Sequence, residues 1–304
     1  MTQTLKRPSW LGRHSLFMLI VFLFQACAVA QPAVEKGVPA LQVIAPNGAT
    51  NVLIGSLHIP ADGLRQPAAS VMNNVKHYLV EHVPENPPVK SPLEVEMAPE
   101  VLRLATQRAH WAEPLSDAQI AGLRRNVRCN VAGLPNSELD NFLKYLLMLK
   151  SAAVASGLAI SPCASLGLLS RDTLLERAAK KQDIPIHPLE TQAQIIKQRM
   201  AVPEEIYQHA LFKAFTSESR NGLRRTVDAL NSGAYEEILV ALDDLAKSPA
   251  DAKIYYRLMV ADRNHAWIPV LRKYLDQGDA VVNVGSAHLP GPEGLIAFAS
   301  VGTR

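Results

Sequence analysis

The sequence predicts an α/β fold, with a central mixed or mostly parallel sheet, flanking helices and a helical insertion. Two observations support this fold class. Short apolar runs rich in β-branched residues, typical of strands, alternate with longer segments whose apolar residues follow helical spacing. Beyond one hairpin near the N-terminus, no long tract contains strands alone, as expected for α/β proteins. With 48% hydrophobic residues, the chain can bury the core of one large domain or two intimate lobes.

The first candidate elements are strands. Residues 40–45 and 51–58 are apolar, β-branched runs around an Asn-Gly turn signal, and they predict a β-hairpin. Residues 67–82, "PAASVMNNVKHYLVEH", have helical spacing and predict a helix that ends at the proline-rich residues 83–92. Residues 91–97, "SPLEVEM", predict the next strand, because apolar residues alternate there with two glutamates.

The rest of the chain is mostly helical by pattern. The segments "SDAQIAGLRRNV" and "NSELDNFLKYLLMLKSAAVASGLA" each open on a capping residue, and they predict a helical insertion at about residues 99–170. The predicted elements that follow are a helix at 170–182, a short strand at 183–190, helices over 190–250, a helical segment at 255–278 and a last strong strand at 279–288.

Residues 1–30 have the layout of a secretory signal peptide. Basic residues precede the run "LFMLIVFLF", and an A-x-A site ends at Ala30. We therefore expect cleavage near Ala30 and a periplasmic or secreted protein. An alternative is a lipoprotein anchored at Cys27, although "FQAC" is a poor lipidation site. The apolar core of about ten residues is short for a span of roughly 20, and no other stretch predicts a membrane span in the mature chain.

Charge and motif content exclude several functions. The chain has 31 Lys plus Arg and 28 Asp plus Glu, and the three basic residues before residue 30 account for the difference. The mature chain is formally neutral and has no long basic run, so we expect no nucleic-acid partner. The motifs H-E-x-x-H, G-x-S-x-G, G-x-G-x-x-G and the Walker loop are absent.

Two cysteines remain after cleavage. Cys129 and Cys163 would be exported to a compartment where disulfides persist, so a Cys129–Cys163 bridge is predicted. The alternative is two buried free thiols, which behave as small apolar groups.

Four polar residues fall at or near the ends of predicted strands. They are His58, Glu94, Glu190 and His288. Ligands of open α/β sheets bind beyond the carboxyl ends of strands, so these residues could converge in one crevice. Two imidazoles with one or two carboxylates suit a divalent Zn, Mn, Fe or Co ion with a position open for water. Such an ion would support metal-assisted hydrolysis.

The two histidines stand in matching motifs. "GSLHIPADGL" contains His58 and "GSAHLPGPEGL" contains His288, and the glycine of each motif would let backbone approach a ligand. The alternative is two unrelated turns, each with a buried, hydrogen-bonded histidine. Arg263 and Asn264 are expected to open the last helix, where an arginine is unfavourable for the helix dipole. This position predicts a carboxylate partner or an anionic transition state, with a surface salt bridge as the alternative.

Taken together, the segments "VLIGSLH", "SPLEVE", "RDTLLERAAKKQDIPIHPLET", "MVADRNHAW" and "VVNVGSAHLPGPEGL" resemble the TraB/GumN family, which includes the Tiki metalloproteases. The resemblance covers about residues 40 to 300 and implies one TraB/GumN-like domain over residues 31–304. One departure is the missing glycine before the aspartate of "LLSRD".

The resemblance implies site residues and an activity. The family's two histidines and the glutamate of the strand after the first motif correspond to His58, His288 and Glu94, with Glu94 as third metal ligand or general base. Arg263 and Asn264 match the family's R-N pair, which would stabilise oxyanion charge or hold the ligands. We expect an exported, metal-dependent hydrolase using Mn, Co, Zn or Fe, most specifically a metallopeptidase acting on peptide or protein. The alternative is a non-catalytic envelope protein that binds peptide or polysaccharide.

Overall fold

The structure is a computed structural model that describes residues 38–45, 47–83, 107–130, 135–149, 151–159, 168–213, 217–243 and 246–301. Several predictions lie outside these residues: the signal peptide and its cleavage site, the lipid anchor at Cys27, the strand with Glu94, and Cys163. The Cys129 side chain is also not described, so the disulfide stays a prediction.

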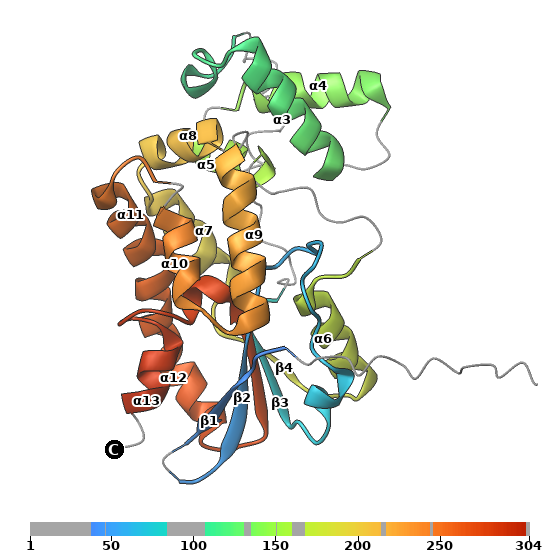
Figure 1. The fold of residues 1–304 in the computed structure, drawn as a ribbon, viewed down its shortest axis with the longest axis vertical. Coiled ribbons are helices and arrows are strands. Elements are labelled where there is room, and N and C mark those ends of the chain that lie inside the picture. The colour runs from blue at the N-terminus through green and yellow to red at the C-terminus, as the bar shows by residue number, and fades with distance from the viewer. Residues whose placement is uncertain are drawn as a thin grey trace, which may run out of the picture. The chain divides into compact units, whose positions relative to one another are not determined.

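Five strands of the described chain form one sheet in the order β1-β2-β5-β3-β4. Their bounds are Leu41–Ile44, Thr50–Ser56, His77–Val80, Ile186–Pro188 and Ala280–Gly285 for β1 to β5. The strands β1 and β2 pair antiparallel, which confirms the predicted hairpin, and all other pairs are parallel. The predicted α/β class with a mostly parallel sheet is therefore confirmed (Figure 1).

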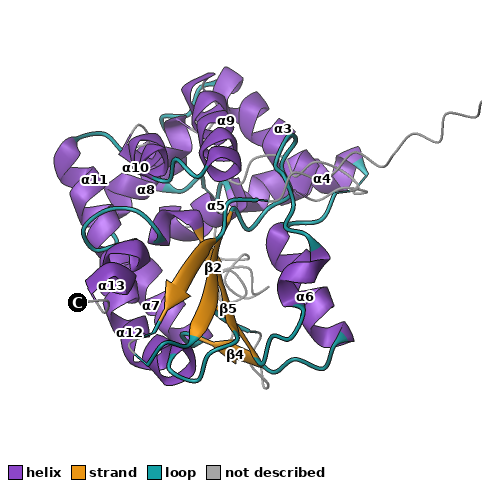
Figure 2. Ribbon diagram, turned by 60° about the horizontal axis from the view of Figure 1, so that its bottom comes forward, coloured by secondary structure: helices purple, strands orange, loops and turns teal. Residues whose placement is uncertain are grey.

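Helices cover both faces of the sheet. On one face, Leu53, Leu79 and Val282 pack against α9 (Ser217–Ser232) and α12 (Asp262–Leu275). On the other face, alternate residues of the same strands pack against α6 (Arg171–Lys181). Figure 2 shows α6 on one side of the strands and α12 on the other. Every residue of β5 is buried, as expected for a central parallel strand with both faces covered.

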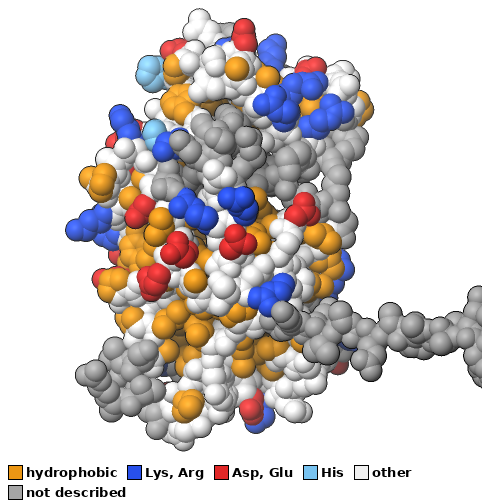
Figure 3. All heavy atoms as spheres, in the orientation of Figure 1, with side chains coloured by type: hydrophobic (Ala, Val, Ile, Leu, Met, Phe, Trp, Pro, Cys, Tyr) orange, Lys and Arg blue, Asp and Glu red, His pale blue; other side chains and the backbone are white. Residues whose placement is uncertain are grey.

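A second apolar core belongs to the helices of the predicted insertion. It joins α3 (Asp117–Asn130), α4 (Asn136–Leu146) and α5 (Ala152–Ala159) to α8 (Glu204–Lys213). The helix predicted from "SDAQIAGLRRNV" is confirmed as α3. The longer pattern that follows it divides into α4 and α5. Figure 3 shows Lys and Arg side chains gathered over α3 and α4.

The described chain has eight further elements. They are η1 (Ala69–Met72), η2 (His110–Ala112), α7 (Gln192–Ala201), α10 (Glu236–Asp243), α11 (Pro249–Tyr256), the π-helical turn η3 (Arg257–Ala261), η4 (Ser286–His288) and α13 (Leu295–Val301). Among the described residues, no helix is long and apolar enough to cross a membrane.

The helix predicted for residues 67–82 is wrong. The segment forms the short 3₁₀ turn η1, reverses at Asn74 with a φ of 61°, and continues as β3. Its apolar residues fit helical spacing, but β3 hydrogen-bonds to β5 on one side and to β4 on the other. Pairing within the sheet overrides the local periodicity, because a central strand satisfies its backbone groups on both sides.

Candidate active site

Polar side chains converge where the parallel strands end. His58 lies two residues beyond β2, Glu81 directly follows β3, and Glu190 lies two residues beyond β4. His288 lies in η4, the turn directly after β5. Three of these four were predicted from the sequence, and Glu81 was not. These side chains lie beyond the carboxyl ends of the parallel strands, where ligands of open α/β sheets bind.

Both histidines approach one carboxylate oxygen. Nε2 of His58 lies 3.1 Å from Oε1 of Glu81, and Nε2 of His288 lies 3.8 Å from the same atom. The two ring nitrogens are thus closer than roughly 8 Å, beyond which metal–nitrogen bonds near 2 Å could not share one ion. Glu81 and His288 are almost fully buried, with side-chain exposures of 10% and 5%, whereas the His58 side chain is 52% exposed.

Gly285 leaves the space in which these groups meet. A Cβ atom at Gly285 would lie 2.7 Å from His58 Nε2 and 2.9 Å from Glu81 Oε1, closer than real Cβ contacts. The backbone N–H of Gly285 donates a 2.6 Å hydrogen bond to the same Glu81 oxygen. The glycine of the first motif has a different role, because a Cβ at Gly55 would meet Leu289 and Leu230 in the core.

Arg263 joins the carboxylates to one histidine. Its Nε donates to both oxygens of Glu190, at 3.0 and 3.2 Å, and Nη2 donates to Glu190 and, at 2.6 Å, to Glu81. Its Nη1 donates to the carbonyl of Met259 at 3.0 Å and lies 3.1 Å from Nε2 of His288. A guanidinium has five N–H groups, so each of them faces an acceptor.

The helical setting of Arg263 differs from the prediction. We expected Arg263 and Asn264 to open the last helix, but α11, η3 and α12 follow one another with helical backbone angles at their junctions, and α13 follows later. The dipole argument for a helix start therefore does not apply. A carboxylate partner exists nevertheless, and the reason is burial, because a buried guanidinium requires a counter-charge. The π-helical turn just before Arg263 has the kind of local distortion found at functional sites.

Asn264 determines the hydrogen-bonding state of His288. Its Nδ2 donates to the carbonyls of His288, at 3.2 Å, and Glu293, at 2.7 Å, so its Oδ1 is left to accept. That oxygen lies 2.7 Å from Nδ1 of His288, which therefore carries the proton. The Nε2 atom of His288 consequently has a free lone pair, which faces Arg263.

Asp172 contacts Nδ1 of His58, as Asn264 contacts Nδ1 of His288. Its Oδ1 lies 3.3 Å from Nδ1 of His58 and accepts a 2.9 Å hydrogen bond from the Asn283 amide. Its other oxygen accepts from the Ser56 hydroxyl, which in turn accepts a 3.2 Å hydrogen bond from the backbone N–H of His58. His58 has a φ of 61°, an uncommon conformation for a non-glycine residue.

The pKa values of the two histidines shift in opposite directions. Burial acts to lower the pKa of His58, but contacts with Asp172 and Glu81 outweigh it and raise the pKa to about 10. Burial, aided by Arg263, lowers the pKa of His288 to about 3. The pKa of Glu81 lies well below its usual range, because contacts with His58, together with the charges of His288 and Arg263, overcome the effect of burial.

The donor set fits a divalent cation in type. Among the described residues, Glu81 and Glu190 contact the Arg263 guanidinium, and Asp172 contacts His58. Imidazole nitrogen and carboxylate oxygen are ligands of Zn, Mn, Fe and Co. Within the described ranges, however, no three side chains stand ready to coordinate an ion, and Arg263 contacts the lone pair of His288. An ion would have to displace that contact.

Comparison with protein families identifies the chain. A sequence profile described as the TraB/PrgY/gumN family matches residues 40–298. The chain belongs to the TraB/PrgY/gumN family. This confirms the resemblance to TraB/GumN proteins seen in the motifs. No curated protein and no protein of solved structure shows significant similarity to it.

Two residues of this TraB/PrgY/gumN site were missed in the sequence. The first strand after the first motif is β3, so the glutamate of that strand end is Glu81, whereas Glu94 lies outside the described residues. The sequence signal that could have identified Glu81 is the run "HYLVE". It is an apolar segment that ends in a charged residue, as several predicted strands end in a histidine or a glutamate. Asp172 stood in the segment "RDTLLERAAKKQDIPIHPLET" that resembles the family, but it was assigned no role in the site.

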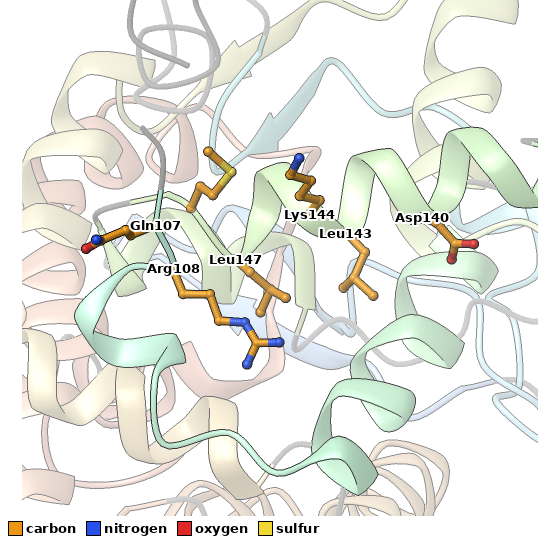
Figure 4. A pocket seen from close by; sticks show the side chains of 7 residues that line it. Gln107, Arg108, Asp140, Leu143, Lys144 and Leu147 are labelled. Carbon is orange, nitrogen blue, oxygen red and sulfur yellow. The ribbon is translucent and has the colours of Figure 1, made fainter. Parts of the chain in front are cut away.

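A separate hollow lies in the helical block of this family member. It has a volume of 330 Å³ and is lined by Gln107, Arg108, Asp140, Leu143, Lys144, Leu147 and Met148. Figure 4 shows Leu143 of α4 and Leu147, the residue after α4, beside Arg108. None of the strand-end residues lines this hollow.

Proposed function

We propose that this TraB/PrgY/gumN protein is an exported metal-dependent hydrolase, and specifically a Tiki-like metallopeptidase that cleaves peptide or protein. The observation that carries the proposal is the approach of both histidines to one oxygen of Glu81 at the edge of the parallel sheet. The ligand types support it, because imidazole nitrogen and carboxylate oxygen are ligands of Zn, Mn, Fe and Co.

His58, His288 and Glu81 are the ligands in this proposal. A divalent ion bound there would lower the pKa of a water molecule and polarise a scissile carbonyl. Nε2 of His58 and Nε2 of His288 supply the imidazole donors, and Nδ1 of each ring is held by Asp172 or Asn264. Glu81 supplies a carboxylate oxygen, and as a carboxylate within hydrogen-bond reach it could instead accept the proton of a nucleophilic water.

Arg263 holds the site together in this account. Glu190 was a predicted ligand, but both of its oxygens accept hydrogen bonds from Arg263, so we assign it the role of orienting the guanidinium. If Nε2 of His288 binds a cation, Nη1 of Arg263 loses that acceptor. One N–H group then becomes available for oxyanion charge on a substrate.

One observation favours the non-catalytic alternative. The contact between Arg263 Nη1 and His288 Nε2 satisfies the histidine without any metal, so the site could be a buried polar network in an envelope protein that binds peptide or polysaccharide. Metal affinity distinguishes the two proposals.

The test compares purified chain with His58→Ala, His288→Ala and Glu81→Gln. We expect about one divalent ion per chain in the wild type, loss of metal from each variant, and metal-dependent cleavage of a peptide library. The control is His265→Ala, which removes an exposed histidine paired with Glu293. The metallopeptidase proposal would be refuted if the wild type holds no more metal than background and the three variants cleave the peptide library as the wild type does.

Export is proposed from the sequence alone. N-terminal sequencing of protein recovered from the periplasm or medium should begin at Gln31. A lipid-modified Cys27 would instead support the lipoprotein alternative. Counting free thiols on unreduced exported protein tests the Cys129–Cys163 bridge, which predicts none.

A further inference from the structure

His58 and His288 are held in different ways. His288 is 5% exposed, its ring packs against Trp267 with centroids 4.3 Å apart, and Asn264 binds its Nδ1. The His58 side chain is 52% exposed, so surrounding atoms restrict its rotation far less. The orientation of His58 must therefore depend on its polar contacts.

Asp172 binds both the ring and the backbone of His58. The ring contact is direct, at 3.3 Å from Nδ1, and the backbone contact passes through the Ser56 hydroxyl. Because Nδ1 faces Asp172, the opposite nitrogen, Nε2, faces Glu81. A freely rotating ring would lose this alignment.

The fold holds Asp172 in place. Arg171, its neighbour, is 1% exposed and donates through Nη1 to the carbonyl of Gly55 at 2.8 Å, and through Nε and Nη2 to the carbonyl of Arg65. These hydrogen bonds connect the first turn of α6 to the end of β2 and to the loop after His58. Ser170 caps the same turn by accepting from the N–H of Thr173.

Asp172 also contacts the central strand. Asn283 of β5 donates to the Asp172 oxygen that faces His58, and it pairs in register with Ile54 of β2. The Asp172 carboxylate thus spans the ends of two neighbouring strands, with one oxygen toward Ser56 and the other toward Asn283 and His58. An amide donor on the shared oxygen limits the rotation of the carboxylate itself.

We infer that Asp172 is a positioning residue that holds the His58 ring with Nε2 directed at Glu81 and His288. This inference deepens the proposed function and rests on it for the role of Nε2. Carboxylates that accept from the second nitrogen of a metal-binding histidine fix its tautomer and ring orientation, and their loss costs about 10- to 100-fold in metal affinity. Asp172 does not itself touch the proposed ion.

The experiment compares wild type, Asp172→Asn and Glu176→Gln. Asp172→Asn keeps the side-chain shape, and the control removes one charge from the same helix at Glu176, which is half-exposed and pairs with Lys180. The first measurement is NMR of ¹⁵N-histidine-labelled, metal-free full chain. We expect a hydrogen-bonded Nδ1 proton signal for His58 that survives in Glu176→Gln and shifts upfield or disappears in Asp172→Asn, because a neutral amide oxygen accepts more weakly than a carboxylate.

The second measurement is Mn²⁺ affinity, which should fall about 10- to 100-fold in Asp172→Asn and change less than about twofold in Glu176→Gln. Thermal unfolding of the metal-free variants separates positioning from general destabilisation. An unchanged His58 signal in Asp172→Asn, or an unchanged affinity, would overturn the inference. If wild type binds no Mn²⁺, the metal proposal fails, while the NMR comparison still decides whether Asp172 holds His58.

Discussion

The backbone N–H of Gly285 donates a hydrogen bond of 2.6 Å to Oε1 of Glu81. The two residues end neighbouring parallel strands, β5 and β3, so the bond ties the carboxylate to the sheet. The same oxygen is the atom approached by both histidines. The sheet backbone therefore fixes the centre of the proposed site.

Gly285→Ala should abolish metal binding. The added Cβ would lie within 3 Å of His58 Nε2 and Glu81 Oε1, so at least one must move away. Gly222→Ala is the control, because it lies in α9 with the nearest atom to a new Cβ at 3.9 Å and should not affect metal binding. Titration with Mn²⁺ checks both. Equal affinity in Gly285→Ala and wild type would show that the ion does not bind beside Gly285.

Arg263→Met should destabilise the fold. It leaves Glu81 and Glu190 buried without their guanidinium, and breaking a buried ion pair by removing one partner typically costs about 3–5 kcal/mol. Arg124→Met is the control, because Arg124 pairs with Asp140 on the exposed surface and should leave the unfolding midpoint nearly unchanged. Urea unfolding measures both changes. If Arg263→Met shifts the unfolding midpoint as little as Arg124→Met does, the buried ion pairs of Arg263 contribute little to the free energy of unfolding.

Asn264→Ala should weaken metal binding and stability together. The side chain is fully buried, and its removal leaves the carbonyls of His288 and Glu293 without a donor, at a cost of about 1–3 kcal/mol. His288 also loses the acceptor that fixes its Nδ1 proton. We expect Mn²⁺ affinity to fall about 10- to 100-fold. Asn47→Ala, which removes an exposed amide that also bridges backbone groups, should retain full affinity.

Protonation of His187 should lower the stability of the fold in mild acid. Burial, together with the charges of His77 and Lys273, lowers the pKa of His187 below its usual 6.5, and its ring stacks on Tyr274. The folded state then binds fewer protons than the unfolded state, so stability falls as pH drops below about 6.5. His187→Gln should reduce the fall in melting temperature between pH 7.5 and 5.5. His110→Gln, at an exposed position, is the control, and an equal slope in His187→Gln would contradict the prediction.

The strand ends were predictable where the local pattern and the tertiary structure agree. The hairpin β1–β2 and the strand β5 are apolar runs ending in G-S-x-H, and the sheet places both histidines at one edge. Arg263 was predicted to have a carboxylate partner or an anionic transition state, and two carboxylates contact it, although the helix-dipole reasoning behind that prediction does not apply. The family resemblance added the order of these segments.

Glu81 was missed for a physical reason. The strand β3 has four residues, and the apolar residues before and within it fit a helix as well as a strand. Only pairing with β5 and β4, which lie 200 and 110 residues further along the chain, selects the strand. The role of Asp172 was not predicted either, because it arises from the contact between α6 and the loop after β2 and not from any local spacing. Long-range contacts of this kind leave no periodicity in a single sequence.

The claim that His58, Glu81 and His288 share one ion is tested most directly by crystals soaked in Mn²⁺ and measured for anomalous scattering. The account predicts one strong peak about 2.0–2.3 Å from Nε2 of each histidine and from a Glu81 oxygen, with Arg263 Nη1 moved away from His288. Absence of a peak at saturating Mn²⁺, with Arg263 still bonded to His288, would contradict it.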